Sequence, residues 1–283
     1  MRLFSESSLK LTFVLQIKKS VDTNVHELNP TGKAIGDTMV KIAVLVKQVP
    51  DTNSKIQISG DRVDLASVKM VMSPFDEFAV ENALLHKEAV GGTVTAITVG
   101  GNSADKVLKD AKAIGVDEIV RLDCTEYMDS NAFQTIISGV ISQDGYEVVY
   151  CGKSSADTGS GSTGPGVAEK LGWASVSNVT GITFADGLTV TAPAEGGDAI
   201  INVAAPVVVS CDKGAIKVRK PNVKGIMMAK RAQVEVKSVS PNSSSVTIVS
   251  QSMPPEKPAG KKFEGGQSAE TVVQLLRDEA NII

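Results

Sequence analysis

Histidine, cysteine and aromatic residues are scarce in this 283-residue sequence, and their scarcity limits the chemistry that its side chains can perform. The two histidines, His26 and His86, leave almost no material for a histidine-based catalytic triad. The three cysteines, Cys124, Cys151 and Cys211, lie far apart, and no cluster of cysteine and histidine has metal-ligand spacing. The sequence therefore argues against a structural metal, a disulfide framework and a haem attachment site.

Charge of one sign and long hydrophobic runs are lacking as well. The 29 basic and 32 acidic residues give a net charge of -3 without a basic block, which disfavours nucleic-acid binding. No apolar run reaches the roughly 18 to 20 residues that a membrane-spanning helix needs, so no membrane insertion is predicted. Together with the scattered cysteines, this composition favours a cytoplasmic protein.

Composition divides the chain into three parts. Residues 1–38 lack the Arg-rich, acid-poor character of a transit peptide, and their apolar stretch at 11–17 is too short for a secretory signal. We interpret them as a poorly ordered extension or as the product of an upstream start site. Residues 39–237 are predicted to form one domain. Residues 238–283, rich in Ser and Pro and ending in a short amphipathic helix, are predicted to form an arm that leaves this domain.

Strand-like and helix-like segments alternate after Met39. The predicted strands lie at 41–46, 93–99, 118–122 and 147–151, and the predicted helices at 75–88, 104–113, 132–141 and 165–171. Alternation in units of roughly 25 to 30 residues implies right-handed crossovers and a parallel sheet covered on both faces. We therefore predict an α/β fold with a three-layer parallel sheet. After Trp173 the runs are shorter and β-like, with a hairpin turn predicted at Asp186 and Gly187.

His86 lies near the C-terminal end of the first predicted helix. A cation suits that end of a helix dipole, so we interpret His86 as a solvated residue without a chemical role.

Glycine and serine concentrate in the loop that follows the strand ending at Cys151. Pro165 suits the first turn of a helix, which Thr163 or Gly164 would cap. Glycines allow backbone N–H groups to approach a phosphate, and a helix N-terminus adds donors and a partial positive charge. Lys153 adds a cation, and hydroxyl groups come from Ser154, Ser155, Ser160, Ser162 and Thr163. We interpret this loop as an anion-binding cradle.

Two other interpretations of the loop are disfavoured. Gly159 to Gly164 match the G-x-G-x-x-G pattern of dinucleotide-binding dehydrogenases. In those proteins, however, the first glycine follows the first strand at once, whereas here it comes about eight residues after the fourth predicted strand. Asp186, at a suitable distance for a ribose carboxylate, falls in the predicted hairpin turn. A merely flexible linker does not suit the abrupt strand–loop–helix setting.

Polar segments follow other early strands, at Val46–Asp51, Ser73–Glu77 and Val99–Ser103. Ligands of open α/β sheets bind at the carboxyl ends of the strands, so these segments and the Gly/Ser loop are expected to converge on one nucleotide. None of them supplies a nucleophile with a base or a general acid with a partner. We therefore predict binding without catalysis, and no catalytic residue.

In their order and spacing, these segments resemble the β-subunit of electron transfer flavoproteins over residues 39–283. The motifs that carry the resemblance are V-K-Q-V-P-D, S-P-F-D-E, C-G-K-S-S-A-D-T-G-S-G-S-T-G-P, A-A-P-V-V-V-S, G-I-M-M-A-K-R and P-P-E-K-P-A-G-K-K-F-E-G-G. The chain departs from the family's usual L-N-E-P-R-Y, which reads A-I-K-V-R-K here and retains only Arg219. It also has V-T-A-P at 190–193, where V-E-R-E is frequent.

The resemblance implies a Rossmann-like, adenine-nucleotide-binding domain of the HUP type, in a heterodimer with a larger α-subunit. That subunit would hold the redox-active FAD, while this chain would bind AMP or, as in electron-bifurcating members, a second FAD. The protein would be an electron carrier and not an enzyme. It would shuttle electrons between acyl-CoA or other dehydrogenases and a quinone oxidoreductase or another acceptor. The alternative is a stand-alone adenine-nucleotide sensor of similar fold.

The resemblance also implies which residues contact the nucleotide. Carried over to this chain, they are Leu45, Ser73, Pro74, Phe75, Asp76, Val99, Gly152, Lys153, Ser154, Ser155, Ala156, Asp157, Thr158, Gly159, Ser160, Gly161, Ser162 and Thr163. Phe75 would also lie toward the flavin of the α-subunit. Residues 212–221 correspond to the family's recognition loop for dehydrogenases, and the arm at 238–283 would dock on the α-subunit.

Overall fold

A parallel sheet forms the centre of the computed structural model, which describes residues 39–185, 187–240, 244–256 and 259–283. Within this part of the chain the sheet has seven strands, in the order β14-β7-β6-β1-β8-β13-β9. Its strands are β1 (Lys41–Leu45), β6 (Thr93–Gly100), β7 (Glu118–Asp123), β8 (Val148–Gly152), β9 (Ala174–Val179), β13 (Val207–Cys211) and β14 (Glu235–Ser238). Residues 1–38, which we expected to be poorly ordered, lie outside the described residues.

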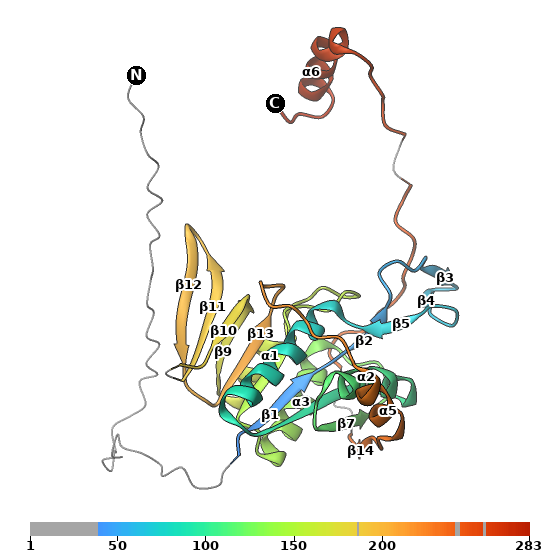
Figure 1. Cartoon of the computed structure of the whole chain (residues 1–283). Coiled ribbons are helices and arrows are strands. Elements are labelled where there is room, and N and C mark those ends of the chain that lie inside the picture. The colour runs from blue at the N-terminus through green and yellow to red at the C-terminus, as the bar shows by residue number, and fades with distance from the viewer. Residues whose placement is uncertain (1–38, 186, 241–243, 257–258) are drawn as a thin grey trace, which may run out of the picture.

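Helices cover both faces of this sheet (Figure 1). They are α1 (Pro74–Val90) and α2 (Asp105–Ile114) on one face, and α3 (Ser130–Asp144) and α4 (Thr163–Leu171) on the other. Side chains alternate along β1: Ile42 and Val44 pack with α1 and α2, whereas Ala43 and Leu45 pack with α3 and α4. The three-layer α/β fold that the sequence predicts is therefore confirmed.

Smaller elements surround the sheet. The strands β10 (Gly181–Thr183), β11 (Leu188–Ala194) and β12 (Gly197–Val203) form an antiparallel sheet beside β9. Two strand pairs precede α1: β2 (Gln48–Pro50) with β5 (Met70–Met72), and β3 (Gln57–Ser59) with β4 (Arg62–Asp64). The short helix η1 (Asn102–Ala104) leads into α2. The hairpin turn predicted at Asp186 lies partly outside the described residues, but β10 and β11 flank it as an antiparallel pair.

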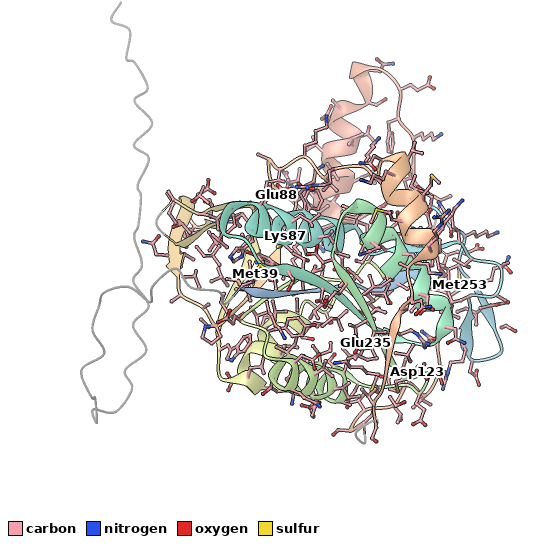
Figure 2. All side chains as sticks on the ribbon, turned by 60° about the horizontal axis from the view of Figure 1, so that its bottom comes forward. Met39, Lys87, Glu88, Asp123, Glu235 and Met253 are labelled. Carbon is pink, nitrogen blue, oxygen red and sulfur yellow. The ribbon has the colours of Figure 1, made fainter. Side chains whose placement is uncertain are left out.

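Two elements of the sheet region are not predicted by the sequence. Helix α5 (Val223–Arg231) packs on α2, and the Cα of Gly225 lies so close to α2 that a Cβ atom there would be 2.3 Å from the carbonyl oxygen of Ala113. Strand β14 then pairs with β7 at the edge of the sheet; Figure 2 labels Glu235 at its start and Asp123 at the end of β7. Both elements are short, and their place depends on contacts with distant segments.

The arm first follows the domain and then leaves it. Asp129 accepts hydrogen bonds from the backbone N–H groups of Ser245 (2.6 Å) and Val246 (3.1 Å), and Arg62 donates to the carbonyl oxygens of Ile248 and Val249. Beyond these contacts, η2 (Gly266–Ser268) and α6 (Ala269–Asp278) stand apart from the sheet in Figure 1. Among the described residues, none of the helices is long and apolar enough to cross a membrane.

The strand order reverses beside β1. The chain runs from β1 to β6 and β7 on one side, and then crosses back to place β8 on the other side of β1. The connecting helices change faces at this crossing, so a crevice opens at the carboxyl ends of β1 and β8. Such a topological switch point is where open α/β sheets bind their ligands.

The prediction that His86 is a solvated residue is wrong. It is buried between α1 and the sheet, where its Nδ1 atom lies 2.9 Å from the hydroxyl oxygen of Tyr150. Its ring also contacts the ring of Phe184, with the two ring centroids 4.7 Å apart and the planes tilted by 37°. Burial lowers the pKa of His86 to about 4. The helical periodicity places the residue correctly on α1, but the sequence does not show that Tyr150 and Phe184 cover this face of the helix.

Because of His86, the folded chain is expected to become less stable in acid. Its pKa is lower in the folded chain than in the unfolded one, so the unfolded chain binds the extra proton and stability falls as the pH drops below about 6.5. Between pH 7 and pH 5 the loss is about 2 kcal/mol. Urea unfolding of the natural chain and of His86→Gln measures it. The difference between the two chains should change by that amount; a constant difference would show that His86 keeps its ordinary pKa.

Candidate ligand-binding site

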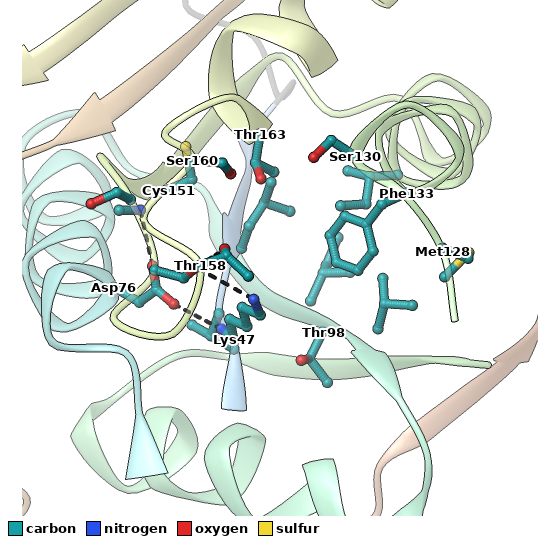
Figure 3. A pocket seen from close by; sticks show the side chains of 18 of the residues that line it. Lys47, Asp76, Thr98, Met128, Ser130, Phe133, Cys151, Thr158, Ser160 and Thr163 are labelled. Atoms are coloured by element: carbon teal, nitrogen blue, oxygen red, sulfur yellow. Dashed lines mark hydrogen bonds between the residues drawn. The ribbon is translucent and has the colours of Figure 1, made fainter. Parts of the chain in front are cut away.

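A cavity of about 360 Å³ lies at the switch point, where the carboxyl ends of β1, β6, β7 and β8 meet (Figure 3). Its volume lies at the lower end of the range of about 300 to 1,000 Å³ that is usual for small-molecule sites. The walls come from the segment after β1, the end of β6, the loop between β7 and α3, and the Gly/Ser loop between β8 and α4. The sheet topology thus brings together segments more than a hundred residues apart.

One side of the cavity is polar and the other is largely apolar. Figure 3 shows Thr158, Ser160 and Thr163 of the Gly/Ser loop facing Phe133 and Met128 across the cavity. Ile97 and Ile137 add further apolar surface to the lining. This arrangement suits a ligand with a flat, poorly hydrated group at one end and a hydrogen-bonding, anionic group at the other.

The structure brings many of the expected nucleotide contacts together in this cavity. Those that line it are Leu45, Asp76, Val99, Gly152, Lys153, Ser154, Ser155, Thr158, Ser160, Gly161 and Thr163. The others lie beside it in the same segments but do not line it: Ser73, Pro74, Phe75, Ala156, Asp157, Gly159 and Ser162. The residues of this second set lie within the Gly/Ser loop or at the start of α1 and support these segments.

The sequence reasoning missed one wall of the cavity completely. The loop between β7 and α3 contributes Cys124, Glu126, Tyr127, Met128 and Asp129, and the first residue of α3, Ser130, lines the cavity beside them. This loop also follows the carboxyl end of a predicted parallel strand, so the rule that selects the other segments would have selected it as well. Its mixed composition, without a glycine cluster, gives no further signal.

Asp76 links the segments on two sides of the cavity. It is buried at the start of α1, where its carboxylate accepts hydrogen bonds from the backbone N–H groups of Lys47 (2.7 Å) and Gly152 (3.1 Å). Burial raises the pKa of Asp76 to about 7, against the lowering effect of these two hydrogen bonds. A Cβ atom on Gly152 would be 2.4 Å from the Asp76 carboxylate, so this contact requires glycine.

Two lysines line the cavity, and each is paired with a carboxylate. The Lys47 ammonium group lies 2.8 Å from Asp157 and 3.3 Å from the hydroxyl oxygen of Ser155, which ties the segment after β1 to the Gly/Ser loop. The Lys153 ammonium group lies 2.9 Å from Asp212 and 4.8 Å from the centre of the Phe75 ring. The sequence prediction included Lys153 and missed Lys47 as a lining cation.

The Gly/Ser loop ends in the first turn of α4, which begins earlier than predicted. The helix starts at Thr163 after an N-cap residue, Ser162, that makes no side-chain capping bond. The expectation that Thr163 or Gly164 caps the helix is therefore wrong. The first N–H groups of α4 have no acceptor within the helix and remain available to an anion. The Gln134 side chain supports this turn by donating to the carbonyl oxygen of Ser162 at 2.9 Å.

Gly161 shapes the same loop. Its φ angle of +64° lies in the left-handed region that glycine adopts most easily, and a Cβ atom there would lie 3.3 Å from the carbonyl oxygen of Lys153. Because Gly161 lines the cavity, the backbone itself forms part of the wall there. Small residues, hydroxyl groups and helix N–H groups thus make up the polar side of the cavity.

The donor set fits an anionic ligand better than a metal ion. Among the residues that the structure describes, no group of three or more His, Cys, Asp or Glu side chains could hold a metal. Cys151 also lines the cavity, and burial raises the pKa of its thiol well above the ordinary value. The thiol is therefore a poor nucleophile.

Fold and cavity together define an α/β protein of the doubly wound class, with a ligand-sized cavity at its topological switch point. Comparison with known proteins agrees with this class. The model of the electron transfer flavoprotein domain matches residues 62–242. The chain belongs to this family, and specifically to its β-subunits.

Three relatives show how far the similarity extends. The electron transfer flavoprotein subunit beta of Syntrophomonas wolfei is 32% identical over 227 residues, which cover 80% of this chain and 90% of the relative. That of Bacillus subtilis is 29% identical over 258 residues, 86% of this chain and all of the relative. The acryloyl-CoA reductase electron transfer subunit gamma of Anaerotignum propionicum is 31% identical over 249 residues, 80% of this chain and 93% of the relative.

Proposed function

We propose that this chain is the nucleotide-binding β-subunit of a heterodimeric electron transfer flavoprotein. The observation that carries the proposal is the cavity at the switch point, with the Gly/Ser loop and the start of α4 on one side and apolar side chains on the other. In this proposal the adenine ring packs between Ile97, Met128 and Phe133. The phosphate lies on the loop near Gly161 and Thr163.

AMP suits this cavity better than a complete FAD. A volume of about 360 Å³ is near the lower end of the range for ligand sites, so a dinucleotide would have to extend through the open side. An electron-bifurcating protein, with a second FAD in this position, is therefore the less favoured form of the proposal. In this proposal, the residues that line the cavity and the residues that support the Gly/Ser loop together form the AMP-binding site.

The redox chemistry in this proposal is supplied by FAD held mainly by the α-subunit. This chain binds its own nucleotide, gives the α-subunit a surface to dock on, and orients it. Electrons pass between acyl-CoA or other dehydrogenases and a quinone oxidoreductase or another acceptor, and the chain acts as a carrier rather than an enzyme. The cysteines that the structure describes are free thiols, which suits the cytoplasm.

The domain from 39 to 237 and the arm from 238 to 283 have different roles in the proposed complex. The arm carries exposed apolar side chains such as Met253 and Phe263, and α6 presents Val273 to solvent. Residues 245–249 remain with the domain through hydrogen bonds to Asp129 and Arg62. We propose that the part beyond Met253 docks on the α-subunit.

The test is to co-express the chain with its α-partner, purify the complex, denature it in acid and separate the released ligands by chromatography. One FAD and one AMP per heterodimer are expected. Two FAD molecules would identify the bifurcating form, and a complex without an adenine nucleotide would contradict the proposal. A stable monomer or homodimer on gel filtration would favour a stand-alone sensor.

A chain ending at Met253 should fold but fail to co-purify with the α-partner.

A further inference from the structure

Residues 212–222 connect the edge of the cavity to the surface helix α5. The segment begins where β13 ends, next to the Gly/Ser loop, whose Lys153 donates its backbone N–H to the carbonyl oxygen of Cys211 at 2.8 Å. It ends at Asn222, which caps α5 by accepting a hydrogen bond from the backbone N–H of Gly225 at 2.8 Å. Residues 212–222 are therefore a short stretch of chain through which a conformational change at the cavity can reach the surface of the domain.

Asp212, the first residue of this segment, forms an ion pair with a lysine that also lines the cavity. Lys153 lines the cavity, but its ammonium group lies 2.9 Å from the Asp212 carboxylate. Both side chains are partly exposed, at 32% for Lys153 and 20% for Asp212, so neither is locked by packing. Asp212 has a second donor of its own, the backbone N–H of Lys213 at 2.7 Å, and does not depend on Lys153 alone.

The far end of the segment is held much more firmly. Arg219 forms hydrogen bonds with the buried carboxylate of Glu81 and with Glu88, both on α1. Its backbone N–H also donates to Glu81 at 3.0 Å. The backbone at the start is held as well, since the N–H of Asp212 donates to the carbonyl oxygen of Val179 at 2.8 Å. What can move at this end is the side-chain pair of Asp212 with Lys153, whereas Arg219 fixes the other end through both its backbone and its side chain.

We propose that Asp212 is a positioning residue that couples occupancy of the cavity to residues 212–218 through Lys153, an inference that rests on the proposed nucleotide site. A bound phosphate carries more negative charge than one carboxylate and lies on the same loop as Lys153, so it draws the ammonium group away from Asp212. The start of the segment then loses its side-chain tie to the loop and keeps only its backbone hydrogen bond to Val179, while Arg219 holds its end. Ligands that fill the cavity without a phosphate leave the pair intact.

The experiment compares AMP with adenosine on the full-length chain, with hydrogen exchange read out for peptides that cover residues 212–218. AMP should increase exchange in these peptides and adenosine should not, although both fill the cavity. Asp212→Asn should show the increased exchange without any ligand, with no further change on adding AMP. It should also bind AMP roughly 3- to 5-fold more tightly, because the competitor for Lys153 is lost, and adenosine with unchanged affinity.

Asp198→Asn, an exposed substitution on β12, is the matched control and should behave as the natural chain in every assay. If AMP binds but exchange at 212–218 is the same with AMP and adenosine, the coupling is overturned. It is equally overturned if Asp212→Asn leaves exchange in the ligand-free chain unchanged, a result that needs no nucleotide. Failure of AMP to bind the natural chain in calorimetry would instead contradict the proposed function.

Discussion

Gly161→Glu should abolish nucleotide binding, with a loss of affinity of about 100-fold or more. The substitution places a carboxylate in the wall of the cavity, beside the first turn of α4. There it would repel a phosphate and occupy the space in which the backbone approaches the ligand. Calorimetric titration with AMP measures the loss directly, and the nucleotide content of the purified complex should fall with it.

Gly159→Glu separates this effect from backbone strain. Gly159 has the same φ angle of +64°, but it does not line the cavity and a Cβ atom there meets nothing within 4 Å. Both substitutions therefore carry a similar cost of about 1 to 2 kcal/mol for a side chain in the left-handed region. Retained binding in Gly159→Glu and lost binding in Gly161→Glu is the expected pair of results. Normal AMP affinity in Gly161→Glu would show that the phosphate lies elsewhere.

Arg219→Met is expected to destabilise the fold by about 3 kcal/mol, because it leaves a buried carboxylate without its cation. The Glu81 side chain is only 5% exposed and lies 2.8 Å from the Arg219 guanidinium. The hydrogen bonds with Glu81 and then with Glu88 raise the pKa of Arg219, so its guanidinium group stays charged throughout the physiological range. The free energy of unfolding in urea, for the natural chain and the variant, gives the magnitude.

A second substitution shows whether the buried charge is the cause. Arg219→Met combined with Glu81→Gln should recover about 2 kcal/mol of the loss, since no uncompensated carboxylate remains. Glu88→Gln is the control, because Glu88 is 54% exposed and its pair with Arg219 is expected to contribute less than about 1 kcal/mol. Figure 2 labels Glu88 near the end of α1. A double variant no more stable than Arg219→Met alone would assign the loss to packing instead.

Local patterns in the sequence were sufficient for the regular core of the fold. The apolar runs at β1, β6, β7 and β8 and the amphipathic helices between them have periodicities that short segments determine by themselves. The Gly/Ser loop could be recognised for the same reason, since its glycines and hydroxyl groups are contiguous. Helix α5 and strand β14 could not, because they depend on contacts with α2 and β7.

The sequence by itself determined the α/β class, the family resemblance and the loop that forms the polar side of the cavity. Only the tertiary structure decided that the loop after β7 forms a wall of that cavity, that His86 is buried against Tyr150, and that Lys153 pairs with Asp212. The physical reason is the range of the interactions. Periodicity and turn chemistry act over a few neighbouring residues, whereas burial, ion pairing and pKa depend on which distant segments the parallel sheet places side by side.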